Sequence, residues 1–197
     1  MQVSLFPLNT VLFPGGPLPL RIFEPRYLEM VSDCLKNDAP FGVLLIREGG
    51  ETGSATTHGI GTLARIRDWY QGSDGLLGIT AIGEQRFRLI SSHSLPSGLN
   101  VGEVEVLPDE PAMPLPDEYK AMSQILAGVL DDLGRLYESL ERRLDDATWV
   151  TSRFVEILPI DLEQKQLCLE QSDPVDRLKI VQALIEASRS PGSGTLG

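Results

Sequence analysis

The chain has 197 residues, of which 42% are apolar, and a formal net charge of -11 at pH 7. This apolar content is enough for one large core or two modest ones, so we expect an ordinary folded protein. The acidic charge disfavours binding to a nucleic-acid backbone. No leader and no apolar run of ~18 residues is present, which disfavours secretion and membrane spanning. We therefore expect a cytoplasmic protein without nucleic-acid or membrane partners.

The segment from Phe6 to Tyr27 is the most informative, because five prolines and a Gly-Gly pair interrupt an apolar run. Proline fixes φ and removes a backbone donor, so only short strands fit between the prolines. We predict a tight loop at Gly15-Gly16 and a short strand from Leu18 to Ile22. A helix should then run from Pro25 to Lys36, since proline is well tolerated in a first turn.

Short apolar runs separated by glycine-rich turns fill most of the first half, which is typical of strands and hairpins. A proline-rich stretch, residues 108–116, then favours an extended, solvated connector. We predict a β-rich lobe over 1–110, a helical lobe over 116–190 and a flexible tail over 191–197. Further strands are predicted over 2–6, 41–46, 62–69, 76–82, 87–90 and 101–106.

Beyond the connector, apolar residues recur at steps of three and four, a spacing that indicates amphipathic helices. Asp117 is the predicted cap of the first, and Asp145-Asp146 can cap the second. Pro159 limits that second helix, and Pro174 begins the last. The helices are predicted over 119–144, 149–158, 162–169 and 174–188.

A family resemblance is carried by the run FPLNTVLFPGGPLPLRIFEPRYLEMVSDCL, which resembles the opening of the Lon N-terminal domain. Later stretches fit the same pattern, namely FGVLLI, GIGTLARI with GEQRFRLI, and LPIDLEQKQLCLEQSDPVDRL. The resemblance implies an α+β fold, with an N-terminal β-rich PUA-like pseudo-barrel containing one helix, followed by a C-terminal helical bundle. It also implies recognition of unfolded or degron-bearing polypeptides, with a separate protease or ATPase as a further candidate partner.

The sequence lacks the catalytic parts of a Lon protease. No GxxxxGK[ST] loop occurs, and this loop is what holds nucleotide phosphates in an ATPase. Only one short helix and a Pro-Gly-Ser-Gly tail follow Leu178, which leaves no room for a peptidase. Cys34 and Cys168 form no CxxC pair, so no zinc site is suggested. We therefore predict a free-standing, non-enzymatic protein with no cofactor, no metal and no catalytic residue.

Four charged residues invite two interpretations. Arg21, Glu24 and Arg26 in LRIFEPRY could form an active constellation, but they could equally tie a strand to the first helix. Arg86 in GEQRF could tie together loops of the barrel, since its planar group of donors suits that role. We favour a structural charge cluster in both cases.

Neither the histidines nor the cysteines indicate catalysis. His58 and His93 lie in separate turn-rich stretches, without a nearby serine or cysteine and acid in a nucleophilic arrangement. Cys34 and Cys168 fall on apolar positions of predicted helices, so both are interpreted as buried thiols.

Aromatic residues beside turns are the best candidates for a binding site. Trp69 and Tyr70 stand at the edge of the QGSDG turn, and Phe13 lies beside Gly15-Gly16. Exposed rings of this kind anchor binding partners, because they offer a large apolar face with little side-chain entropy to lose. The alternative is that the rings fold back over one end of the barrel.

We therefore predict a protein that binds polypeptides through an apolar surface of the β-rich lobe or through the cleft between lobes. The main alternative is a small-ligand-binding protein or an enzyme that uses this cleft. RNA binding through the PUA-like fold is a third hypothesis, and the acidic charge stands against it.

Overall fold

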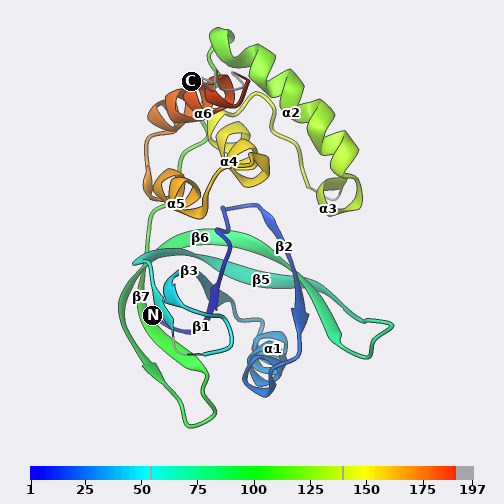
Figure 1. Cartoon of the computed structure of the whole chain (residues 1–197), viewed down its shortest axis with the longest axis vertical. Coiled ribbons are helices and arrows are strands. Elements are labelled where there is room, and N and C mark those ends of the chain that lie inside the picture. Colours follow the sequence, from blue (N-terminus) through cyan, green and yellow to red (C-terminus); the bar gives the residue numbers. More distant parts are fainter. Residues whose placement is uncertain (54, 139, 190–197) are drawn as a thin grey trace, which may run out of the picture.

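The first half of the chain winds into a twisted sheet, and the second half forms helices stacked over one end of that sheet (Figure 1). The structure, a computed structural model, describes residues 1–53, 55–138 and 140–189. Strands precede helices along the chain, with one helix inserted among the strands, so the predicted α+β fold class is confirmed. The predicted tail, residues 191–197, lies outside the described residues.

Seven strands form one sheet in the order β1-β7-β6-β5-β3-β4, while β2 lies off this path and pairs with β6. Strand β1 also pairs in parallel with β3, so the strands close into a pseudo-barrel. The apolar run Phe41 to Ile46 is buried throughout, because both faces of β3 are covered. The strands are β1 (Gln2–Leu8), β2 (Pro17–Ile22), β3 (Phe41–Gly49), β4 (Ala55–Thr57), β5 (Ile60–Gln71), β6 (Leu77–Ser94) and β7 (Asn100–Val106).

Two features of the sheet differ from the prediction. The strands predicted over 76–82 and 87–90 are one continuous strand, β6, and the short β4 was not predicted. Strand β6 bends around the barrel through irregularities in its pairing, where Ile90 interrupts its register with β7 and Arg67 of β5 interrupts the register with β6. Such bulges increase local twist and re-aim side chains, and sequence patterns seldom mark them.

The helix α1 (Pro25–Asn37) begins at its proline, as predicted, and covers the end of the barrel away from the other helices (Figure 1). Its buried face packs into the barrel core together with apolar side chains from β1, β2, β3, β5 and β6. That face consists of Tyr27, Met30, Val31 and Cys34.

In the second lobe, the prediction of one long helix over 119–144 is wrong. The helix ends at Leu133 because Gly134 has a φ of 61°, which a right-handed helix cannot continue. Asp117 lies within a short 3-10 turn instead of capping a helix, whereas Asp146 caps the next helix by accepting from Thr148 N. The elements are η1 (Asp117–Tyr119), α2 (Lys120–Leu133), α3 (Arg135–Glu138), α4 (Ala147–Ile157), α5 (Leu162–Glu170) and α6 (Pro174–Arg189).

The two lobes are joined by a common apolar core. Val11, Phe13 and Leu45 of the β-rich lobe lie in the same buried cluster as side chains of α2, α4, α5 and α6. The connector is extended but not free, since Leu115 N donates to Asp145 O and Ala147 N donates to Met113 O, both at 2.7 Å. The division into 1–110 and 116–190 stays a prediction about folding units. None of the described helices is long and apolar enough to span a bilayer.

Candidate functional site

The β5–β6 hairpin carries exposed aromatic side chains and reaches out beyond the barrel (Figure 1). Trp69 is 60% exposed and Tyr70 46% exposed, and Leu76 at the tip is exposed as well. We call these three side chains the hairpin surface; Trp69 and Tyr70, which are consecutive in β5, project from opposite faces of the strand. Large apolar side chains on a projecting hairpin offer contact area that the fold itself does not use.

The hairpin surface is held in place by its surroundings. Gly75 takes a φ of 80°, which closes the tip without strain. Asp74 forms an ion pair with Arg21 of β2, so the tip is fastened to a second strand. The Tyr70 ring packs across Gly78, where any side chain would overlap the ring. A ring positioned in this way loses little conformational entropy when it contacts a partner.

Phe13, the third predicted binding ring, is not available to a partner. It is 1% exposed and lies in the apolar core between the lobes. The prediction is wrong because the helical lobe covers this end of the barrel, so the Phe13 ring packs against its apolar side chains. Phe13 instead fits the alternative interpretation, in which the ring folds back over one end of the barrel.

The four predicted charged residues do not form one cluster. Arg26 pairs with Glu24 at 2.8 Å and donates to the carbonyl oxygens of Gly98 and Glu51, which ties the start of α1 to two loops. Arg21 lies elsewhere, on the exposed side of β2, paired with Asp74. Arg86 is far from both and sits between the lobes.

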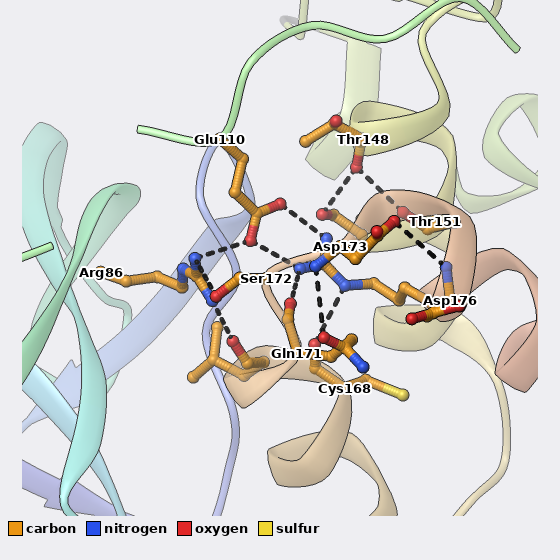
Figure 2. A network of polar contacts seen from close by, with 12 residues as sticks. Arg86, Glu110, Thr148, Thr151, Cys168, Gln171, Ser172, Asp173 and Asp176 are labelled. Carbon is orange, nitrogen blue, oxygen red and sulfur yellow. Dashed lines mark hydrogen bonds and ion pairs between the residues drawn. The ribbon is translucent and has the colours of Figure 1, made fainter. Parts of the chain in front are cut away.

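Arg86 shares one carboxylate with a second buried arginine (Figure 2). Glu110 Oε1 lies 2.9 Å from Arg86 Nη2 and 2.6 Å from Arg177 Nη2, and its Oε2 accepts from Arg177 Nη1 at 2.8 Å. Arg86 also donates to Leu169 O at 2.7 Å. Burial lowers the pKa of Arg86, Glu110 opposes this, and Arg177 adds to the lowering. This triad connects strand β6, the connector and helix α6.

A second buried ion pair lies where the Gly15-Gly16 loop contacts α4. Arg153 Nη2 donates to Glu156 Oε1 at 2.6 Å and to Pro14 O at 2.8 Å. A side chain at Gly16 would collide with the Glu156 carboxylate, so glycine is needed for this close approach. Burial raises the pKa of Glu156 to about 7, and the neighbouring Arg153 opposes the rise.

Sequence reasoning missed Arg153, Glu156 and Arg177. Arg153 and Arg177 contact groups that are distant in the sequence, namely Pro14 O and Glu110. The only local signal was the spacing of Arg153 and Glu156, three residues apart on one helix, which places them on the same side.

A cleft of about 690 Å³ lies between the lobes, with walls from both. Arg67 and Arg86 enter it from the β-rich lobe, and Trp149 and Arg143 from the helical lobe. The Arg67 side chain has no hydrogen bond or ion pair with any other described residue, whereas Arg86 is held by Glu110. The cleft has no group of three or more metal-ligating side chains, and neither does the rest of the described chain.

The histidines and cysteines form no reactive arrangement among the described residues. His58 Nε2 lies 3.3 Å from Glu163 Oε1, and His93 is exposed on β6. Cys34 and Cys168 are both buried, as predicted. Burial raises the pKa of Cys34 to about 11, which disfavours its thiolate form.

Comparison with known proteins gives a clear result. A family model for the ATP-dependent protease La (LON) substrate-binding domain matches residues 2–187. The chain belongs to this family. A crystal structure of a Lon N-terminal domain protein from Xanthomonas campestris superposes with a TM-score of 0.77 and 35% identity, covering 93% of this chain and 98% of that one. The resemblance seen in the sequence is thereby confirmed.

A more distant solved structure shares the fold, and weaker sequence matches extend to longer proteins. The N-terminal domain of a Mycobacterium avium complex Lon protease has a TM-score of 0.65 at 18% identity, covering 98% of this chain and all of that one. Lon protease 2 from Myxococcus xanthus is 24% identical over 95% of this chain and 24% of its own length. Protein cereblon from Xenopus tropicalis is 29% identical over 58% of this chain and 26% of its own length. The chain thus spans about a quarter of these two curated relatives.

Proposed function

We propose that this Lon-family substrate-binding domain binds unfolded or degron-bearing polypeptides through the hairpin surface and catalyses no reaction itself. The carrying observation is the exposure of Trp69 and Tyr70 on a projecting hairpin, because a family of substrate-binding domains needs an apolar contact surface. Tryptophan and tyrosine dominate binding energy at protein interfaces, which supports these two rings as anchors.

The geometry supports binding more than catalysis. The buried carboxylates are engaged in ion pairs: Glu110 joins the lobes through Arg86 and Arg177, and Glu156 pairs with Arg153 within α4. The matched family is a substrate-binding domain and not an ATPase or peptidase. We infer that a separate protease or ATPase receives the bound chain, as would suit relatives named Lon protease, in which a matching region is part of a longer protein.

The test is to replace Trp69 by serine and titrate the variant with unfolded casein. Loss of an anchor ring should weaken binding by about 2 kcal/mol, roughly thirtyfold in Kd. The free energy of unfolding in urea should fall by less than about 1 kcal/mol, because the ring is mostly exposed. The casein should also be recovered intact after incubation, as expected of a protein that does not cleave it.

Ile90 provides a matched control. It is 57% exposed, but it lies in the part of β6 that pairs with β7 and not in the β5–β6 hairpin. Ile90→Ser should leave casein affinity unchanged. Equal affinity of the Trp69→Ser variant and the unchanged chain would exclude the hairpin surface, and a large loss of stability would show that the ring supports the fold instead.

A second candidate function is binding of a small anionic ligand in the cleft between the lobes. The unpaired guanidinium of Arg67 favours it, because it can bind a carboxylate, and Trp149 in the lining of the same cleft offers an apolar face for the rest of such a ligand. Thermal unfolding of the wild type and an Arg67→Ala variant with aromatic carboxylates would test it. Stabilisation that requires Arg67 supports the idea, and no shift in either protein counts against it.

A further inference from the structure

A buried arginine with unused donors lies behind one wall of the inter-lobe cleft. Arg153 of α4 is fully buried, and its Nε and Nη1 atoms have no hydrogen-bond partner among the described residues. Its remaining nitrogen, Nη2, donates to Pro14 O and to Glu156 Oε1. Buried donors nearly always have a partner, and a charged donor is the costliest to leave without one. The two unused nitrogens therefore call for a partner from outside the chain.

The Nη1 atom lies behind Gly15, at a place where the cleft wall has no side chain. Gly15 lines the cleft together with Pro14 and Trp149. A side-chain carbon at Gly15 would lie 3.2 Å from Arg153 Nη1, and no other described atom outside residues 14–16 would lie within 4 Å of it. A separation of this size is within the range of an N–H···O hydrogen bond. We call this open place the Gly15 site.

The donors at the Gly15 site suit a carboxylate better than a phosphate. The backbone N–H groups of Gly15 and Gly16 are already bonded to Gly83 O and Phe13 O. Phosphate groups bind where several N–H groups converge, and the described loop leaves none of its own free. A carboxylate can be held by one charge-assisted hydrogen bond from a guanidinium. The Trp149 ring, 5.8 Å from the guanidinium carbon of Arg153, offers an apolar face to the rest of such a ligand.

The charge around the Gly15 site also favours an anion. Arg153 has one ion-pair partner within the described chain, Glu156, and burial raises the pKa of that carboxyl to about 7. Near neutral pH, many molecules therefore carry the Arg153 charge beside a protonated Glu156. The acids that line the cleft are engaged with donors of the protein itself, namely Asp109, Glu110, Glu141 and Asp146.

We propose that the Gly15 site binds a carboxylate group, which accepts from Arg153 Nη1 and lies against Trp149. The carboxylate at the end of a polypeptide and that of a small organic acid share this chemistry. The inference goes beyond the proposed function, because the Gly15 site is not part of the hairpin surface. It also differs from the second candidate function, in which Arg67 holds the anion. Since Nη1 is covered in the free protein, the bound group must displace the Gly15 backbone slightly.

The variant Gly15→Asn tests the site. Gly15 has a φ of 73°, which asparagine tolerates, and the new side chain would fill the Gly15 site. Gly98→Asn is the matched control, since Gly98 has a φ of 82° and lies in a loop of the β-rich lobe. Sodium acetate is titrated into the wild type and both variants, with sodium chloride keeping the ionic strength constant. The amide resonance of Gly16 is followed by NMR.

Acetate should shift the Gly16 resonance in a saturating manner in the wild type and in Gly98→Asn. In Gly15→Asn its affinity should be at least about tenfold lower, the effect of one charge-assisted hydrogen bond. An equal response in all three proteins, or one that does not saturate, would overturn the site. No response in the wild type would mean that Nη1 is left to water, and it would overturn the site as well. If Gly15→Asn does not fold, saturation at Gly16 without a shift at Gly98 in the wild type is the deciding result.

A short peptide with a free C-terminus and its amidated form distinguish the two sources of carboxylate. If the site takes chain ends, the free form should bind about tenfold more tightly than the amidated form. Equal binding of the two forms, alongside a saturating acetate response, would assign the site to small organic acids. Casein binding by the hairpin surface is measured separately, so either proposal can fail while the other stands.

Discussion

Phe13 and Trp69 are both aromatic residues beside glycine turns, yet one is sealed in the core and the other is 60% exposed. The difference lies in what covers each turn. The helical lobe lies over the Gly15-Gly16 loop, whereas the hairpin reaches past every other element (Figure 1). Local sequence marks a turn and a ring, but the arrangement of distant elements decides whether the ring serves folding or contact.

The substitution Phe13→Ala tests this difference between the two rings most directly. Removal of a fully buried ring should lower the free energy of unfolding by about 3 to 5 kcal/mol. Urea unfolding, followed by circular dichroism, gives the value. The same change at Trp69 is the control and should lower it by less than about 1 kcal/mol. Similar losses at the two positions would contradict the assignment of one ring to the core and one to the surface.

The polar contacts between the lobes can be tested through Glu110→Gln. Two buried arginines would lose their shared carboxylate, so we expect a loss of about 3 kcal/mol in unfolding free energy. Glu105→Gln is the matched control, because Glu105 pairs with Arg88 in an exposed position. That change should lower the free energy of unfolding by less than about 1 kcal/mol. Equal effects would mean that the triad adds nothing beyond a surface ion pair.

The pH dependence of stability should report on Glu156. Burial raises the pKa of this carboxyl from 4.5 to about 7, so the folded protein holds the proton more tightly than the unfolded chain does. The resulting stabilisation is fully present below the unfolded pKa and is lost as the pH rises through the folded value. Across that pH window the free energy of unfolding of the wild type should fall by about 3 kcal/mol relative to that of Glu156→Gln. Parallel stability curves for the two proteins would show that Glu156 does not titrate there.

The close approach of the two lobes at Gly16 predicts a smaller effect. Gly16→Ala should destabilise the fold by about 2 kcal/mol, because the new methyl group displaces the Glu156 carboxylate and presses on the Phe13 carbonyl oxygen. Gly128→Ala is the opposite case, since nothing lies within 4 Å and the site is helical. It should raise stability by up to about 1 kcal/mol. Thermal melts of both variants would measure the difference.

Features set by neighbouring residues were predictable from the sequence. Pro25 and Pro174 begin helices, and Asp146 caps one, because these residues act on their own turn. The end of α2 at Gly134 depends on a backbone conformation that glycine permits but does not require, so the helix was predicted too long.

Features set by distant residues could not be predicted in the same way. Arg86 was assigned to loops of the barrel, yet its partners belong to the connector and to the helical lobe. No pattern within β6 points to Glu110. For the candidate site, the exposure of Trp69 and Tyr70 agrees with the sequence, while the burial of Phe13 emerges only from the fold.

The burial of Arg86, Arg153 and Arg177 also bears on the electrostatic field around the protein. These side chains are three of the seventeen Lys and Arg residues, and they are withdrawn from the solvent. Their partners Glu110 and Glu156 are withdrawn with them, so the outer surface keeps the acidic excess of a chain whose net charge is -11. Its long-range field should draw in basic stretches of other chains and turn away acidic ones, and added salt should weaken this steering.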